Sequence, residues 1–144
     1  PHRAGRRHVG ALAPDAPILV DTATWIFWHA GSPRLSATAR ALLAQSLERP
    51  VHVSVVSAFE IATKVRLGKL VVPDELLHDF AYLVESDGFR VVPLGAESSV
   101  RAGMLAGEHR DPFDRLLAAQ ALELGATLLS PDAAFASLGV PALW

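Results

Sequence analysis

Short apolar runs alternate along the chain with longer segments in which apolar residues recur every three or four positions. The short runs predict buried strands at residues 18–20, 51–53, 90–93 and 127–130, and a short edge strand within residues 140–144. Short apolar strands separated by helices are typical of parallel sheets that are covered on both faces. The pattern therefore predicts an α/β fold with a central, mostly parallel sheet of four to five strands.

The segments between the runs carry helical spacing and helix-boundary residues. Helices are predicted directly after Asp21, from Ser36 to about Glu48, from Ser54 or Ser57 to Gly68, from Pro73 to Asp87-Gly88, across residues 96–106, and from Pro112 to Gly125. The last of these has the clearest signals, because Asp111 stands before a proline at the first helical position.

Composition narrows the class of protein. The chain has 144 residues, which corresponds to one domain, and its hydrophobic content is 51%. No apolar run approaches the ~18 residues of a membrane span, so no membrane association is expected. There is no cysteine, which excludes disulfides, zinc–thiolate sites and thiol catalysis and fits a reducing cytoplasm.

Charge is distributed unevenly. Residues 1–10 hold three arginines and no acid, and residues 1–16 show no periodicity, so they are expected to be an N-terminal tail or a cloning remnant, or else a basic arm that contacts RNA or a partner. The rest of the chain carries 10 basic and 15 acidic residues, a net charge of -5. A domain this acidic is not a general nucleic-acid-binding protein. Any action on nucleic acid therefore requires a local site, which is expected to contain a metal ion.

Four carboxylates are placed where they can meet at one edge of the sheet. Asp21 and Asp132 follow two predicted strands, Asp114 lies in the first turn of the helix that leads to the fourth strand, and Glu60 stands between two apolar residues in mid-helix. Without a cation such acids repel one another, whereas with Mg²⁺ or Mn²⁺ they form an oxygen site suited to phosphodiester hydrolysis.

Each acid also has a purely structural interpretation. Asp21 and Asp111 can cap helices, Asp114 can interact with a helix dipole, Asp132 can begin a turn, and Glu60 can pair with Lys64 four residues on. Taken singly, none of the four carboxylates is persuasive, and it is their joint placement that favours a metal site.

Five segments together resemble PIN-domain ribonucleases and, among these, the VapC-type toxins of bacterial toxin–antitoxin systems. They are Leu19-Val20-Asp21-Thr22 with the Trp-rich helix after it, Arg34-Leu35-Ser36, Ser57-Ala58-Phe59-Glu60-Ile61-Ala62-Thr63-Lys64 running into Leu67-Gly68-Lys69-Leu70, His109 to Ala121, and Leu128-Leu129-Ser130-Pro131-Asp132. The fourth segment is the most specific. The resemblance implies a PIN-like three-layer sandwich over residues 17–144.

The resemblance also implies roles for individual residues. Asp21, Glu60, Asp114 and Asp132 correspond to the acids that hold Mg²⁺ or Mn²⁺ and catalyse RNA hydrolysis, and Asp114 is preferred to Asp111 because it directly precedes the Arg-Leu-Leu-Ala-Ala-Gln helix. Candidates for substrate contact are Lys64, Arg115, Ser130 and Thr22, although Lys64 and Arg115 can instead pair with Glu60 and Asp114. Asp111 and His109 are expected to lie behind the metal-binding acids, with a general base as the second interpretation of His109.

Partners follow from the same resemblance. It implies an RNA substrate, a homodimer, a cytoplasmic location and a VapB-like antitoxin that inserts near the acids. Trp25 and Trp28 are expected in the core or at a partner surface, not as base-stacking platforms.

Other functions find less support in the residues. A nucleotide-binding fold would need a glycine-rich turn after the first strand, where Asp-Thr-Ala-Thr stands, and no phosphate-binding loop is present. A phosphatase with an aspartyl nucleophile would need a second acid at position 23, which is alanine. A non-catalytic binding module would be marked by the loss of an acid, and none is lost.

Overall fold

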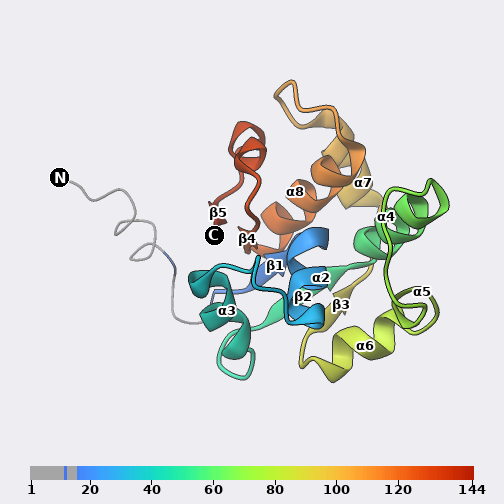
Figure 1. The fold of residues 1–144 in the computed structure, drawn as a ribbon. Helices are drawn as coiled ribbons and strands as arrows, with labels where there is room; N and C mark the ends of the chain where they lie inside the picture. The colour runs from blue at the N-terminus through green and yellow to red at the C-terminus, as the bar shows by residue number, and fades with distance from the viewer. Residues whose placement is uncertain (1–11, 13–15) are drawn as a thin grey trace.

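A five-stranded sheet forms the centre of the protein (Figure 1). The structure, a computed structural model, describes residue 12 and residues 16–144. The strands are β1 (Ile18–Val20), β2 (Val51–Ser54), β3 (Arg90–Val92), β4 (Thr127–Leu129) and β5 (Ala142–Leu143). Their order is β3-β2-β1-β4-β5 and every neighbouring pair is parallel, which confirms the predicted α/β fold and parallel sheet.

Helices connect the strands. They are α2 (Thr22–Ala30), α3 (Ala37–Ala44), α4 (Val55–Arg66), α5 (Glu75–His78), α6 (Phe80–Ser86), α7 (Ala96–Met104) and α8 (Pro112–Leu124), with a 3₁₀ helix η1 (Ala133–Leu138) before β5. The predicted boundary residues act as expected at α8, where Asp111 caps the start and Gly125 ends the helix at φ 63°. Within the described part of the chain, no helix combines the length and apolar character that a membrane crossing requires.

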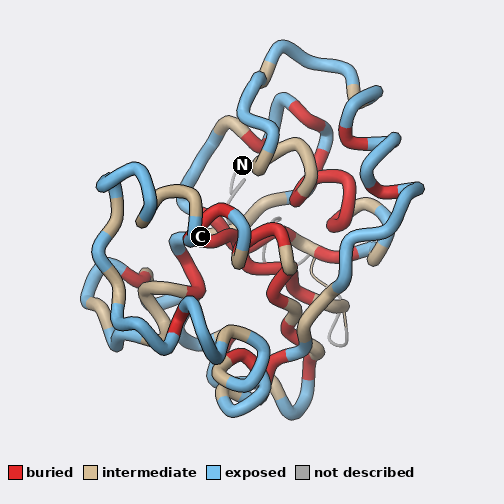
Figure 2. The backbone as a smooth tube through the Cα atoms, turned by 90° about the vertical axis from the view of Figure 1, so that its right-hand side faces the viewer, coloured by how far each residue is buried: buried red, intermediate tan, exposed pale blue. Residues whose placement is uncertain are grey.

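The sheet separates two hydrophobic clusters, as the alternation of side chains along β1 requires. Ile18 and Val20 belong to a cluster that includes residues of α2, α3, α5 and α6, whereas Leu19 belongs to a cluster with α8 and η1. Figure 2 shows the buried backbone gathered in the interior and the exposed segments around it. The chain is therefore a three-layer sandwich, as predicted.

Two predicted helices differ from the structure. The helix expected from Pro73 to Asp87 is two helices, because Asp79 adopts φ -125° and ψ 32° and interrupts it. The helix expected to reach Glu48 ends at Ala44, since residues 45–48 turn and Leu47 is fully exposed. In both segments the spacing of apolar residues is compatible with a longer helix, but the tertiary packing does not favour one. The tail predicted over residues 1–16 lies almost wholly outside the described residues.

Candidate active site

Strand register brings three polar residues side by side at the carboxyl edge of the sheet. Val20 of β1 is paired with Val53 of β2 and with Leu129 of β4. The residues that follow these three are Asp21, Ser54 and Ser130, respectively, and each is buried. The chain leaves β1 toward β2 on one side, and β4 lies on the other, so Asp21 stands at the topological switch point where α/β sheets bind ligands.

Asp21 both caps a helix and faces this edge. Its Oδ1 accepts a hydrogen bond from the Thr24 backbone N–H at 2.9 Å, and its Oδ2 accepts one from the Ser130 hydroxyl at 2.5 Å. Burial raises the pKa of the Asp21 carboxyl, the hydrogen bonds from Ser130 and Thr24 oppose this, and the negative charge of Glu60 adds to it. The cap interpretation is thus correct, and it leaves a buried carboxylate beside another acid.

Glu60 projects from α4 toward the start of α2. Its Oε1 accepts a hydrogen bond from the Thr22 hydroxyl at 2.6 Å, and its Oε2 accepts one from the Lys64 ammonium at 2.6 Å. The Lys64 pKa is raised by this hydrogen bond, although partial burial opposes the rise, and the charges of Glu60, Asp111 and Asp114 raise it further. The predicted Glu60–Lys64 pair is confirmed, and a contact of Lys64 or Thr22 with substrate stays a prediction.

Asp114 lies in the first turn of α8 beside His109. The distance from Asp114 Oδ2 to His109 Nε2 is 2.8 Å, so His109 donates a hydrogen bond whenever Nε2 carries a proton. Burial raises the pKa of Asp114 to about 6, the hydrogen bond from His109 opposes this, and the charges of Asp111 and Asp132 raise it. His109 therefore contacts Asp114 directly, and its role behind the metal-binding acids stays a prediction.

Asp132 is the exposed acid of the four. Its Oδ1 accepts a hydrogen bond from the Ala134 N–H at 2.9 Å and so begins η1, and its own N–H donates to the Ser130 hydroxyl at 3.0 Å. Because Ser130 also donates to Asp21, this one hydroxyl connects two of the four acids.

Arg115 has a different place from the one predicted. Its guanidinium donates to the carbonyls of Ala102, Gly103 and Leu105 at the end of α7, and to that of His109. These are carbonyls that a helix end and a loop leave without backbone partners. Arg115 thus fixes the connection between α7 and α8 and does not form the ion pair with Asp114. Its contact with phosphate stays a prediction.

The four acids share one electrostatic environment without forming a closed metal cage. The pKa values of Asp21 and Asp114 are each raised in part by another acid of the set. Within residues 12 and 16–144, however, no three His, Asp or Glu side chains stand close enough together to hold a metal ion as they are. The donor set suits Mg²⁺ or Mn²⁺, because all four side chains offer hard oxygen ligands and their mutual repulsion would be relieved by a cation.

Sequence reasoning missed two supports of this edge. Gln120 of α8 is buried, its amide donates to the Pro93 carbonyl at 3.1 Å, and its carbonyl oxygen accepts from the Ser54 hydroxyl. Ser57 lies 2.9 Å from the Thr22 hydroxyl. The sequence marked the two serines only as possible helix starts, and nothing local identifies Gln120 as a buried bridge.

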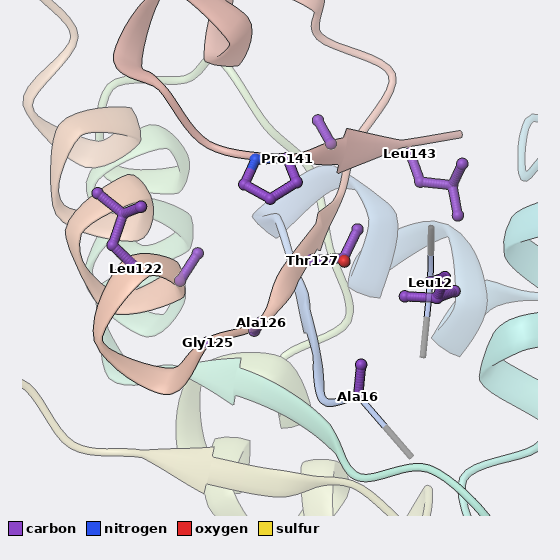
Figure 3. Close-up of a pocket in the computed structure, with 10 residues that line it drawn as sticks. Leu12, Ala16, Leu122, Gly125, Ala126, Thr127, Pro141 and Leu143 are labelled. Carbon is purple, nitrogen blue, oxygen red and sulfur yellow. The ribbon is translucent and has the colours of Figure 1, made fainter. Parts of the chain in front are cut away.

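An apolar cavity of about 400 Å³ lies at the opposite edge of the sheet (Figure 3). It is lined by residues before β1, around the start of β4 and before β5, including Ala16, Thr127 and Pro141. None of its described lining residues has a titratable side chain. This cavity therefore offers no acid–base group among its described residues.

Lowering the pH from about 7 to about 4 is expected to stabilise the metal-free protein relative to its Asp114→Asn variant. The folded-state pKa of about 6 lies above the ordinary 3.8, so folding disfavours the ionised carboxylate. This cost is complete above pH ~6 and disappears as the pH falls toward the unfolded-state value. Between these two pH values, we expect the free energy of unfolding of the wild type to rise by about 1–2 kcal/mol relative to that of the variant. This is less than the full pKa shift would give, because the carboxylate is partly open to solvent.

Urea denaturation in EDTA at several pH values measures this difference. Parallel pH profiles for the two proteins would contradict the raised pKa.

Comparison with known proteins places this arrangement in a family. Residues 18–141 match the PIN domain family. No curated protein sequence matches the chain. Among solved structures, a chain of FitAB bound to the IR36 DNA fragment is similar with a TM-score of 0.60 and 18% identity, over 88% of this chain and 93% of that one.

Two further structures have the same fold. A chain of FitAcB from Neisseria gonorrhoeae gives a TM-score of 0.58 and 21% identity, over 88% of this chain and 96% of that one. A chain of VapBC2 from Rickettsia felis, bound to a DNA fragment from their promoter, gives a TM-score of 0.65 and 14% identity, over 88% of this chain and 98% of that one. The fold, the family match and the acids at the carboxyl edge agree, and the chain belongs to the PIN domain family.

Proposed function

We propose that this chain is a metal-dependent endoribonuclease, the VapC-type toxin of a toxin–antitoxin pair. One observation carries the proposal. In a PIN fold whose strand ends are in register, Asp21 stands at the switch point, with Glu60 coupled to it on one side and Asp132 connected through Ser130 on the other. Asp114 adds a fourth carboxylate, electrostatically coupled to Asp132.

In phosphodiester hydrolysis, these residues would have three separate roles. Asp21, Glu60, Asp114 and Asp132 would hold Mg²⁺ or Mn²⁺, and Thr22, Ser130 and His109 would keep three of these carboxylates oriented through the hydrogen bonds described above. A bound divalent cation supplies Lewis-acid activation of the phosphate and a water of lowered pKa. Lys64 adds a positive charge that RNA phosphates can approach.

An antitoxin partner, a homodimer and a cytoplasmic location belong to the same proposal. The antitoxin is supported by the structural neighbours, which are chains of the FitAB and VapBC2 complexes. A basic antitoxin segment would be attracted to the acidic edge of the sheet. The competing interpretation is a non-catalytic PIN module. It would be marked by the loss of an acid, and all four acids are present.

An RNA-cleavage assay tests the proposal. Purified protein is incubated with total cellular RNA in Mg²⁺, in Mn²⁺ and in EDTA, beside the Asp114→Asn variant. We expect metal-dependent cleavage that EDTA stops and that Asp114→Asn lowers at least about 100-fold, because a carboxylate of the metal site is lost. Glu85→Gln is the matched control, since Glu85 is exposed on α6, which leads to the opposite edge of the sheet.

Cleavage that persists unchanged in EDTA would contradict the proposal. So would equal activity of Asp114→Asn and wild type.

A further inference from the structure

An exposed aromatic ring belongs to the same turn of α4 as one of the four carboxylates. Phe59 of α4 is 67% exposed, although it directly precedes Glu60, which is buried. Its ring centroid lies 5.7 Å from that of Phe113, with an angle of 58° between the rings. Phe113 is half-buried, and it directly precedes Asp114. Each ring is thus attached to the helical turn that presents one acid of the site.

Positive charge lies close to the same surface. Lys64 is one turn further along α4, its side chain is 43% exposed, and its pKa responds to the charges of Asp111 and Asp114 at the start of α8. The surface between α4 and α8 therefore combines an aromatic face, a cation and the candidate catalytic acids. Single-stranded RNA is bound by such a combination, because its bases stack on aromatic rings while its phosphates meet cations.

We propose that Phe59 is a base-stacking residue that positions an unpaired nucleotide of single-stranded RNA beside the carboxylate edge. Phe113 contacts the ring of Phe59, which stays largely exposed and so available to a base. The inference rests on the proposed nuclease function and deepens it, since it assigns a residue that positions the substrate. Duplex RNA would not offer a free base face to this ring.

The test is binding of a fluorescein-labelled single-stranded RNA of mixed sequence to the Asp114→Asn protein in EDTA, where cleavage is not expected. Fluorescence anisotropy measures the binding. We expect Phe59→Ala and Phe59→Leu to weaken binding about 5- to 100-fold, as loss of one stacked base does, whereas Phe59→Trp and Phe59→Tyr retain it. Leucine keeps the apolar contact with Phe113 and removes only the aromatic face. The same RNA annealed to its complement should bind weakly and respond little to Phe59 variants.

Tyr82→Ala is the matched control, because Tyr82 is 70% exposed on α6 and has no part in the site. In the active protein, Phe59→Leu should raise KM for RNA more than it lowers kcat. If Phe59→Leu binds single-stranded RNA as tightly as the parent protein, the inference is wrong and the exposed ring serves a protein contact. Binding is measured without catalysis, so wild-type inactivity would overturn the nuclease proposal and leave this measurement interpretable.

Discussion

The Asp21→Asn substitution is expected to abolish metal-dependent cleavage while stabilising the metal-free protein. Asp21 is only 8% exposed and lies at the switch point between β2 and β4. On the proposed function, removing its charge removes a ligand of the metal ion that a neutral amide would replace poorly. We therefore expect a loss of at least about a thousandfold in cleavage rate. Burial raises the pKa of Asp21, which means that the ionised carboxylate opposes folding, and the neutral amide avoids this cost.

The geometry makes Asn the appropriate replacement. Its side-chain oxygen can accept the hydrogen bond from the Thr24 N–H, and its amide group can pair with the Ser130 hydroxyl. Asp21→Ala, in contrast, removes both hydrogen bonds and the helix cap, and it should destabilise the protein by about 1–2 kcal/mol. The pair therefore separates the catalytic effect of the charge from the structural effect of the cap.

Thermal unfolding in EDTA and in Mn²⁺ measures both parts. The wild type should gain thermal stability from Mn²⁺, and Asp21→Asn should gain little. Asp21→Asn that cleaves RNA normally, or that is less stable than the wild type without metal, would show that this carboxylate is a structural cap alone.

The sheet was predictable because its signals are local. Ile18, Leu19 and Val20 form an apolar run, and all three are fully buried in β1, which has helices on both faces. Helix ends marked by a capping side chain or a glycine were also predictable, as at Asp111 and Gly125. The break at Asp79 and the 3₁₀ helix η1 were missed, because apolar spacing alone does not distinguish a continuous helix from two short ones.

The candidate site was predictable only in part, for a related reason. Three of the acids could be located because each stands near a strand end or helix start, and parallel strands align those ends. Glu60 was singled out instead as a charge between two apolar residues in mid-helix. The hydrogen bonds of Arg115 were not predicted, because its carbonyl partners belong to α7 and the following loop, whose position depends on tertiary packing. The bridging role of Gln120 depends likewise on two distant strand ends that no sequence pattern relates to it.

The Trp25→Ala substitution is expected to cost about 3–5 kcal/mol of the free energy of unfolding, which is a large part of the stability of a small domain. Trp25 is fully buried in α2, and its ring meets that of Phe80 edge-on at 5.1 Å. Its Nε1–H donates to Asp87 Oδ2 at 3.1 Å, so truncation also removes a partner from a partly buried carboxylate. This one side chain connects α2 to α6 across the layer that covers one face of the sheet.

Urea denaturation of Trp25→Ala, Trp25→Phe and Tyr82→Ala tests this role. Trp25→Phe keeps an aromatic ring and loses the N–H, so its free energy of unfolding should lie between that of the wild type and that of Trp25→Ala. Tyr82 belongs to α6 as well, but it is 70% exposed, so Tyr82→Ala should stay within about 0.5 kcal/mol of wild type. Equal unfolding midpoints for Trp25→Ala and Tyr82→Ala would mean that the indole is not the anchor between α2 and α6, and that the helix layer is held by its aliphatic contacts.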